Sequence, residues 1–260
     1  MPLQAAVQPA PRVLVHHLAD QRPAPSASAS HHTIPRVDGL GLIERHVEVQ
    51  RRMLRAGEAV YKAGDRFTHL HIVHSGCFKV VNVSPDGREK VVAVRFKGDW
   101  LGFDGIADGR HDCDAIAMDT GAVLTLRYDA LVDAARAEPA LMMALHAAMS
   151  REIARDRTSM MSLCTLPSDA RVAEFLRDWA QSLAERGLRT DQITLRMTRA
   201  EIGNFLGMTL ESVSRALSRL AREQVIRFAE KARRELQIPD IGALERFIER
   251  CCAPARATLQ

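Results

Sequence analysis

The chain is 260 residues long, carries a formal net charge of +4 and is 47% hydrophobic. This length and apolar content suffice for two compact domains with cores of their own, which excludes a disordered chain. No run reaches the roughly 18 consecutive apolar residues of a membrane-spanning helix, and no apolar signal segment begins the sequence, so we expect a cytoplasmic protein without a membrane partner.

The five cysteines are scattered along the chain: Cys77, Cys113, Cys164, Cys251 and Cys252. They lack the C-x-x-C spacing of metal-binding or redox motifs. This usage is typical of reduced thiols, because disulfide frameworks are rare inside cells. We therefore expect neither a disulfide framework nor a metal site.

The first half divides into a tail and a β-rich region. Residues 1–38 are rich in Pro, Ala and Ser without apolar periodicity, which predicts a flexible extension. From about residue 43 to residue 127, short β-like runs alternate with glycines spaced roughly ten residues apart, as in turns between short strands. This pattern predicts an antiparallel β-barrel or jelly roll over residues 39–138.

The period becomes helical from Tyr128, and Pro139 interrupts it, so we predict a long helix over residues 139–166. Its apolar stripe comprises Leu141, Leu145, Met149, Ile153 and Met160, with Asp156 in the same region. The stripe could pack against the barrel or against a second copy of the helix. A dimer seam is the favoured interpretation, because the helix is longer than a barrel of this size can cover.

Residues 167–245 contain helical patterns followed by two short strands, which predicts a winged helix-turn-helix domain, with residues 246–260 as a C-terminal tail. Thr198 and Glu201 form a capping-box pattern that begins one helix. Gly207 suits a sharp turn, and Thr209 can cap the next helix. The whole chain is thus expected to be α+β.

The helix after Thr209 turns Val213, Leu217 and Leu220 to one side and a polar face to the other. In helix-turn-helix proteins the first turn of this helix enters the major groove of double-stranded DNA. The candidate DNA contacts are Thr209, Glu211, Ser212, Ser214, Arg215 and Arg219. A local excess of basic residues up to Arg234 favours the same partner. The sequence contains no catalytic motif of the common hydrolase or nucleotide-binding types, so we expect no enzyme.

The segment MTRAEIGNFLGMTLESVSRALSRL resembles the recognition segment of the Crp/Fnr superfamily of transcription regulators, and GDWLGFDGIADGRH resembles its Fnr branch. The resemblance extends from about Val47 to about Ile241. It implies a barrel like the cyclic-nucleotide-binding domain and a homodimer. It also implies that Glu211, Ser214 and Arg215, in the pattern E-x-x-S-R, read a TTGAT…ATCAA palindrome.

The chain departs from the family's pattern at the positions that hold its two familiar ligands, an iron–sulfur cluster and cyclic AMP. An iron–sulfur cluster needs about four thiolates, but no cysteine precedes Cys77, and Leu124 stands where the family places a ligand in the barrel. The place of a cyclic phosphate is taken by acidic residues, which repel an anion: Asp104, Asp108, Asp112 and Asp114. We therefore expect neither a cluster nor cyclic AMP.

The histidines of the run H-x-H-x-x-H leave a second hypothesis open. His69, His71 and His74 are most simply ordinary barrel residues, but a haem or metal ligand is conceivable at this spacing. The alternative to a ligand-free regulator is therefore one that binds DNA only with haem, nitric oxide or a small metabolite.

Two further expectations come from the resemblance. The exposed turn at Asp86, Gly87, Arg88 and Glu89 corresponds to a hairpin that touches RNA polymerase in Fnr-type activators, although a solvated hairpin is the simpler interpretation. Asp156 corresponds to a helix carboxylate that makes dimerisation depend on a signal. Arg155 and Arg157 flank it and could neutralise it, which favours a constitutive dimer.

Overall fold

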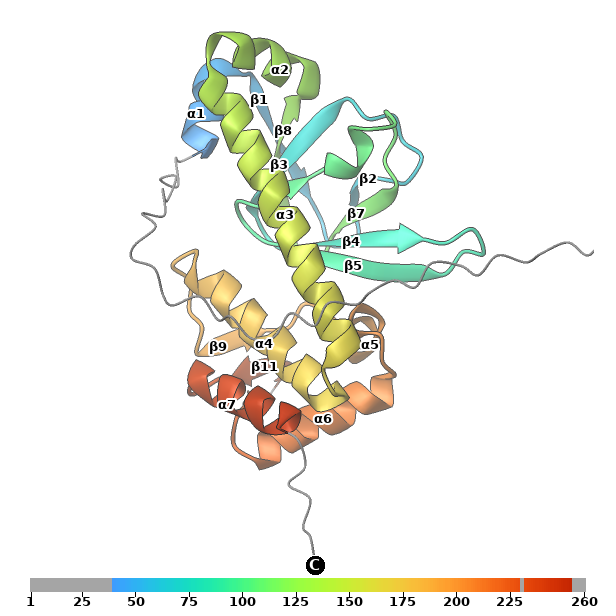
Figure 1. The fold of residues 1–260 in the computed structure, drawn as a ribbon, viewed down its shortest axis with the longest axis vertical. Helices are drawn as coiled ribbons and strands as arrows, with labels where there is room; N and C mark the ends of the chain where they lie inside the picture. Colours follow the sequence, from blue (N-terminus) through green and yellow to red (C-terminus); the bar gives the residue numbers. More distant parts are fainter. Residues whose placement is uncertain (1–38, 230–231, 254–260) are drawn as a thin grey trace, which may run out of the picture. The chain divides into compact units, whose positions relative to one another are not determined.

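The computed structural model describes residues 39–229 and 232–253 (Figure 1). The extension predicted over residues 1–38 and the last residues of the predicted tail, 254–260, lie outside the described residues. In the described part, no helix is long and apolar enough to cross a membrane.

The N-terminal domain is a jelly roll of two facing antiparallel sheets rather than a closed barrel. In order across the first sheet, the strands are β1 (Val49–Leu54), β8 (Gly121–Arg127), β3 (His69–Ser75) and β6 (Trp100–Leu101). The second sheet contains β2 (Ala59–Tyr61), β7 (Cys113–Ala117), β4 (Phe78–Val83) and β5 (Glu89–Arg95). Gly121 begins β8 so close to β3 that an added Cβ would lie 2.6 Å from the Ser75 carbonyl oxygen.

Strand β3 is buried on both of its faces. Because side chains alternate along a strand, Val73 points into the core between the sheets, whereas Leu70 and Ile72 belong to a second core under helices. That second core is covered by α1 (Gly39–His46), α2 (Tyr128–Ala137) and the start of α3 (Pro139–Thr165). The β-like run expected from about residue 43 is wrong at its start, because Leu42 and Ile43 lie on a helix and pack into this core.

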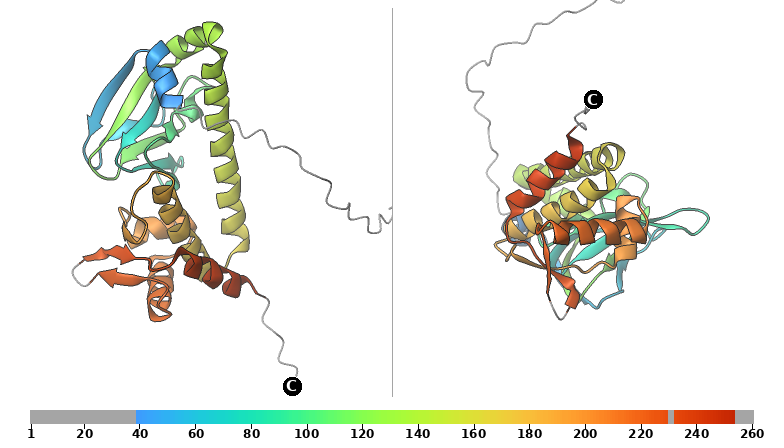
Figure 2. Two further views of the ribbon diagram at one scale, coloured as in Figure 1. Left: turned by 90° about the vertical axis from the view of Figure 1, so that its left-hand side faces the viewer. Right: turned by 90° about the horizontal axis from the view of Figure 1, so that it is seen from below.

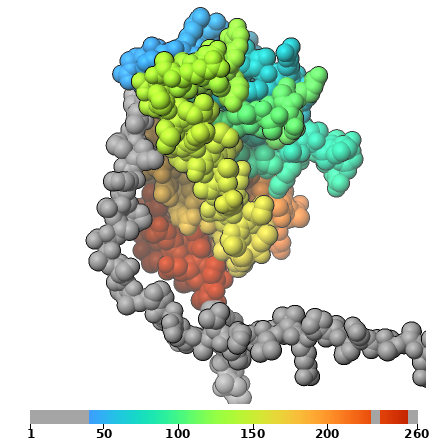
Figure 3. Space-filling view, turned by 45° about the horizontal axis from the view of Figure 1, so that its top comes forward, coloured from blue at the N-terminus to red at the C-terminus, as the bar shows by residue number. Residues whose placement is uncertain are grey.

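Helix α3 agrees with the predicted helix over 139–166 to within one residue, with Pro139 in its first turn and Glu138 as its cap. Its apolar stripe divides into two parts. Leu141 and Leu145 are buried against the jelly roll, so Leu145 does not lie on an open seam as predicted. Ile153 and Met160 remain exposed, and Figure 3 shows the yellow-green surface of α3 open to solvent on one face.

The C-terminal domain is the predicted winged helix-turn-helix. Its elements are α4 (Ser168–Ala184), β9 (Gln192–Thr194), α5 (Arg199–Leu206), α6 (Leu210–Arg222), β10 (Arg227–Ala229), β11 (Ala232–Gln237) and α7 (Ile241–Cys252). The strands form one antiparallel sheet in the order β10-β11-β9. The predicted boundary at residue 245 is wrong: α7 continues to Cys252 (Figure 2), and Phe247 is only 1% exposed because it shares the buried face of α7 with Leu244.

Candidate nucleic-acid interface

The turn between α5 and α6 is built as the sequence predicts. The Thr198 hydroxyl accepts a hydrogen bond from the Glu201 N–H at 3.1 Å, and Glu201 accepts one from the Thr198 N–H at 2.8 Å. Gly207 ends α5 with a φ of 62°, and Thr209 caps α6 by accepting from the Ser212 N–H at 3.2 Å. At Gly203 an added Cβ would lie 2.6 Å from the Met208 carbonyl oxygen. The glycine therefore permits the tight approach of the turn to α5.

Helix α6 is amphipathic in the predicted sense. Val213, Leu217 and Leu220 are buried, whereas the polar candidates occupy the other side. Thr209, Glu211, Arg215 and Arg219 are exposed, and Ser212 and Ser214 are half-buried. A groove of about 670 Å³ lies beside this face and is also lined by Ser168 and Asp169 at the start of α4.

Hydrogen bonds hold the first two turns of α6 in place. The Arg215 guanidinium donates to the Ser212 hydroxyl at 3.2 Å, and among the described residues no ion pair joins it to Glu211. Hydrogen bonds from its own N–H and from Thr209 lower the pKa of Glu211, which therefore stays ionised. Arg199 donates to the Ser214 hydroxyl at 3.2 Å. Sequence reasoning missed Arg199. The periodicity of the sequence places this arginine on α5, but it cannot show which residue of α6 the arginine contacts.

Arg219 differs from the other candidates because its charge is already engaged. Its guanidinium donates to Asp169 at 2.6 Å and to Glu223 at 3.0 Å, and it lies 5.6 Å from the centre of the Phe247 ring. Asp169 is 50 residues earlier in the chain, so no local sequence signal pairs it with Arg219. The arginine links α6 to α4 and α7 and presents little free charge.

Helix α5 is also attached to the jelly roll. The Asn204 side chain accepts a hydrogen bond from the Val91 N–H and donates one to the Glu89 carbonyl oxygen, both at 2.7 Å. It thereby pairs with the edge of β5 as a neighbouring strand would. Lys79 adds an ion pair to Glu201 at 2.6 Å.

The hairpin between β4 and β5 is an exposed turn with Gly87 at a φ of 80°. Its tip carries an ion pair of 2.7 Å between Arg88 and Asp86, and the Arg88 side chain is 84% exposed. The sequence therefore located the turn correctly, and both charges face solvent.

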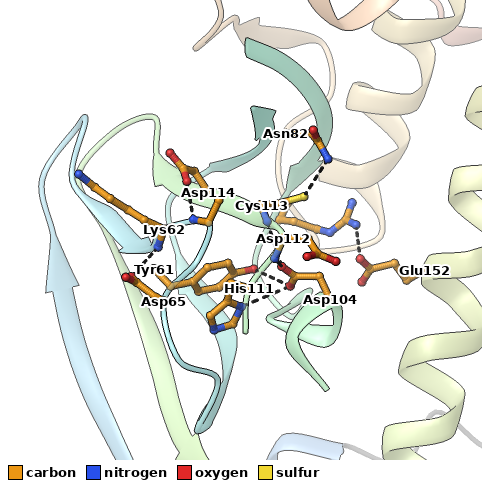
Figure 4. A network of polar contacts seen from close by, with 12 residues as sticks. Tyr61, Lys62, Asp65, Asn82, Asp104, His111, Asp112, Cys113, Asp114 and Glu152 are labelled. Carbon is orange, nitrogen blue, oxygen red and sulfur yellow. Dashed lines mark hydrogen bonds and ion pairs between the residues drawn. The ribbon is translucent and has the colours of Figure 1, made fainter. Parts of the chain in front are cut away.

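The acidic segment expected at a cyclic-phosphate position forms a polar network (Figure 4). Asp104 accepts hydrogen bonds from the N–H groups of Asp112 at 2.9 Å and Cys113 at 3.2 Å, and Asp114 accepts one from the Ala63 N–H at 2.7 Å. Burial raises the pKa of Asp104, but hydrogen bonds from His111 and these N–H groups outweigh it, so the net shift is downward. The segment thus presents a fixed negative charge.

Of the three predicted histidines, His71 is the most deeply placed. It is 6% exposed, and its Nδ1 lies 2.9 Å from the Thr125 hydroxyl. The rings of His69 and His71 are 6.5 Å apart. Throughout residues 39–229 and 232–253, no group of three or more His, Cys, Asp or Glu side chains could hold a metal ion.

Acid should destabilise the fold through His71. Burial lowers the pKa of His71 to about 3, below the ordinary value of 6.5. Between these values the unfolded chain binds a proton that the folded chain does not, so stability falls as the pH drops below about 6.5. We expect wild type to lose about 2 kcal/mol more than His71→Gln between pH 7 and pH 5, measured by urea unfolding. Equal losses of unfolding free energy in the two proteins would contradict this role of His71.

The comparisons with known proteins agree with this architecture. The family described as the Crp-like helix-turn-helix domain matches residues 170–247, and the cyclic nucleotide-binding domain matches residues 51–138. The fumarate and nitrate reduction regulatory protein of Yersinia pestis is 31% identical over 75% of this chain and 75% of its own length. The anaerobic regulatory protein of Aggregatibacter actinomycetemcomitans is 32% identical over 75% of this chain and 73% of its own length.

A solved structure supports the fold. FixK2 from Bradyrhizobium japonicum is 24% identical and superposes with a TM-score of 0.68 over 80% of this chain and 100% of its own. Together with the sequence relatives, this shows that the chain belongs to the Crp/Fnr family of helix-turn-helix DNA-binding transcription regulators.

Proposed function

We propose that this protein is a cytoplasmic transcription activator that binds a TTGAT…ATCAA palindrome as a homodimer. The observation that carries the proposal is the placement of Glu211, Ser214 and Arg215 together at the start of α6, beside an open groove. Arginine can donate two hydrogen bonds to guanine, glutamate can accept from cytosine N4, and serine suits either base. These are the groups that a half-site containing one G·C pair requires.

The base preference can be tested with two duplexes. One carries TTGAT…ATCAA, and in the other the G·C pair of each half-site is replaced by A·T. Because each mismatched pair costs about 1–3 kcal/mol, we expect the second duplex to bind at least tenfold more weakly in fluorescence anisotropy at fixed salt. Equal affinities would contradict the proposed readout.

The dimer is proposed to form along α3. Next to the face that packs on the jelly roll, a stripe recurs at alternating steps of three and four residues: His146, Met149, Ile153, Asp156 and Met160. This spacing is the heptad pattern of paired helices. Ile153 is 49% exposed and Met160 is 66% exposed, so both side chains are available to a second copy.

A charge in this stripe should separate the subunits. We expect Ile153→Glu to shift the protein from dimer to monomer, because two facing carboxylates would repel each other in an apolar seam. Arg151→Glu places the same side chain on the opposite, exposed face of α3 and should leave the dimer intact. The molar mass from light scattering distinguishes the two. A dimeric Ile153→Glu would place the interface elsewhere.

Asp156 is also proposed to lie at this seam. Arg155 was expected to help neutralise it, but the Arg155 guanidinium is paired with Asp99 at 2.8 Å. Arg157 has no recorded partner within the described chain and is exposed. Neutralisation of Asp156 across the dimer would therefore depend on Arg157.

The hairpin at Asp86, Gly87, Arg88 and Glu89 is proposed to contact RNA polymerase, because its charged tip projects from the sheet and the side-chain contacts of Asp86 and Arg88 stay within the turn. We expect Arg88→Glu to reduce transcription from a TTGAT…ATCAA promoter in vitro while leaving the affinity for the duplex unchanged. Unaltered transcription would remove the hairpin from the activation mechanism.

We also propose that the regulator acts without catalysis, an iron–sulfur cluster or cyclic AMP. Leu124 is buried in the core under the helices, and Cys77 is buried with its thiol 3.7 Å from the Met118 sulfur. The fixed charge of Asp104 disfavours a cyclic phosphate at the segment where the resemblance places it.

A further inference from the structure

A cavity of about 580 Å³ opens between the two sheets where β1, β2, β3 and β8 meet. Its volume lies within the roughly 300–1,000 Å³ of small-molecule sites. The walls include Tyr61, His69, His71 and His111, and three arginines line it as well: Arg51, Arg52 and Arg66. None of these residues belongs to the proposed DNA or dimer surfaces.

The four rings form a nearly parallel row. His111 stacks on Tyr61 with centroids 3.7 Å apart and planes inclined by 13°. Tyr61 is followed by His71 at 5.8 Å and 28°, and His71 by His69 at 6.5 Å and 31°. Because aromatic rings at such separations attract one another, the row forms one packed wall of the cavity. It favours a flat ligand that can continue the stacking at His69, which is partly exposed.

One buried imidazole has unused hydrogen-bonding capacity. His71 is bonded through Nδ1 to Thr125, and its Nε2 has no partner in the described chain. His111 is 4% exposed, and its Nδ1 faces the Asp104 carboxylate at 3.5 Å, so that atom is not available to a ligand. Leaving buried polar groups incompletely bonded costs free energy. A ligand with oxygen atoms could reduce that cost.

The charge of the lining is positive. Arg51 and Arg66 are exposed and have no recorded side-chain partner among the described residues. Arg52 is held in place by donating to the carbonyl oxygens of Val60 at 2.9 Å and Ala59 at 3.0 Å. Within this lining the one carboxylate is Asp65, which accepts a hydrogen bond from the Lys62 N–H at 2.9 Å. The excess of guanidinium groups favours an anion.

We propose that this cavity binds a small planar organic anion of the aromatic carboxylate class. The rings supply stacking, the free Nε2 of His71 supplies a hydrogen bond, and the arginines supply charge complementarity. The cavity adjoins the acidic segment, because Tyr61 and His111 each contact the Asp104 carboxylate from the far side of the ring row. The proposal stands independently of the DNA sequence that the protein reads.

Three probes of similar size separate shape from charge. Benzoate is planar and anionic, cyclohexanecarboxylate is anionic but not planar, and benzamide is planar but neutral. In isothermal titration calorimetry of the full chain, we expect benzoate to bind at least tenfold more tightly than either of the others. The larger 2-naphthoate should bind more tightly still, because it buries more apolar surface. Equal affinities for the three, or no binding of benzoate and 2-naphthoate, would overturn the proposal.

Variants locate the site. Arg51→Ala and His69→Ala alter residues of the lining that are exposed or half-exposed, so the fold should survive. Each is expected to weaken benzoate binding about tenfold, which corresponds to about 1.4 kcal/mol. Arg55→Ala removes an exposed arginine that does not line the cavity and is the matched control. An equal loss of benzoate affinity in Arg55→Ala would show that the effect comes from surface charge and not from the cavity. Because DNA binding is measured without these probes, the outcome leaves the proposed function unaffected.

Discussion

Replacing Arg215 with alanine is expected to weaken binding to the TTGAT…ATCAA duplex by about 30-fold to 10⁴-fold. A bidentate contact to guanine contributes about 1–3 kcal/mol, and a dimer makes it twice. The Arg215 side chain is exposed, and its one recorded hydrogen bond within the described chain is to Ser212. The loss should therefore arise at the DNA surface, with the thermal midpoint of unfolding unchanged.

Arg222→Ala provides the matched control for this prediction. Arg222 is an exposed arginine at the other end of α6 and lines the same groove. If it reaches only a phosphate, its removal should weaken binding to specific and unrelated duplexes alike and reduce the salt slope by about 1. A comparable loss of affinity for both duplexes in Arg215→Ala would show that Arg215 contributes charge and not base readout.

The second large effect is expected in the core of the DNA-binding domain. Phe247 is 1% exposed and packs in the same cluster as Trp179 and Leu244. The guanidinium groups of Arg219 and Arg250 each lie 5.6 Å from its ring centre. Truncating a buried phenylalanine to alanine costs about 3–5 kcal/mol. We therefore expect Phe247→Ala to lower the free energy of unfolding of this domain by that amount.

Urea unfolding followed by tryptophan fluorescence measures this change, because Trp179 reports on the same core. Glu249→Ala alters an exposed residue of the same helix and should leave stability nearly unchanged. If Phe247→Ala and Glu249→Ala were equally stable, the segment after residue 245 would be a tail after all, as the sequence alone predicted.

Features encoded by neighbouring residues were predictable from the sequence. The capping box at Thr198, the left-handed Gly207 and the cap at Thr209 each depend on a few adjacent residues, and the structure confirms all three. The apolar period of α6 likewise identified its buried side. Local signals therefore sufficed for the helix-turn-helix and for the open face of its second helix.

Contacts between distant segments were not predictable in this way. The period of α3 shows that Leu145 lies on an apolar face, but not that the jelly roll covers it. The ion pairs of Arg219 with Asp169 and of Arg155 with Asp99 join residues 50 and 56 positions apart. Both arginines look free in the sequence. Which charges remain available to DNA or to a second subunit depends on this tertiary pairing.

The strand expected near residue 43 and the domain end expected at residue 245 both differ from the structure, for a related reason. Leu42 and Phe247 lie in short amphipathic helices at the edges of their domains. Short apolar runs do not distinguish a strand from a helix, and helix ends are poorly fixed by sequence. In each case burial against a neighbouring helix decides the structure.

The readout by a dimer is tested by measuring how the purified chain, with no ligand added, binds a TTGAT…ATCAA duplex and one with a single half-site scrambled. We expect one dimer bound to each intact palindrome, with an affinity at least tenfold higher than for the scrambled duplex. Equal affinities for the two duplexes, or one subunit bound per palindrome, would contradict readout by a dimer.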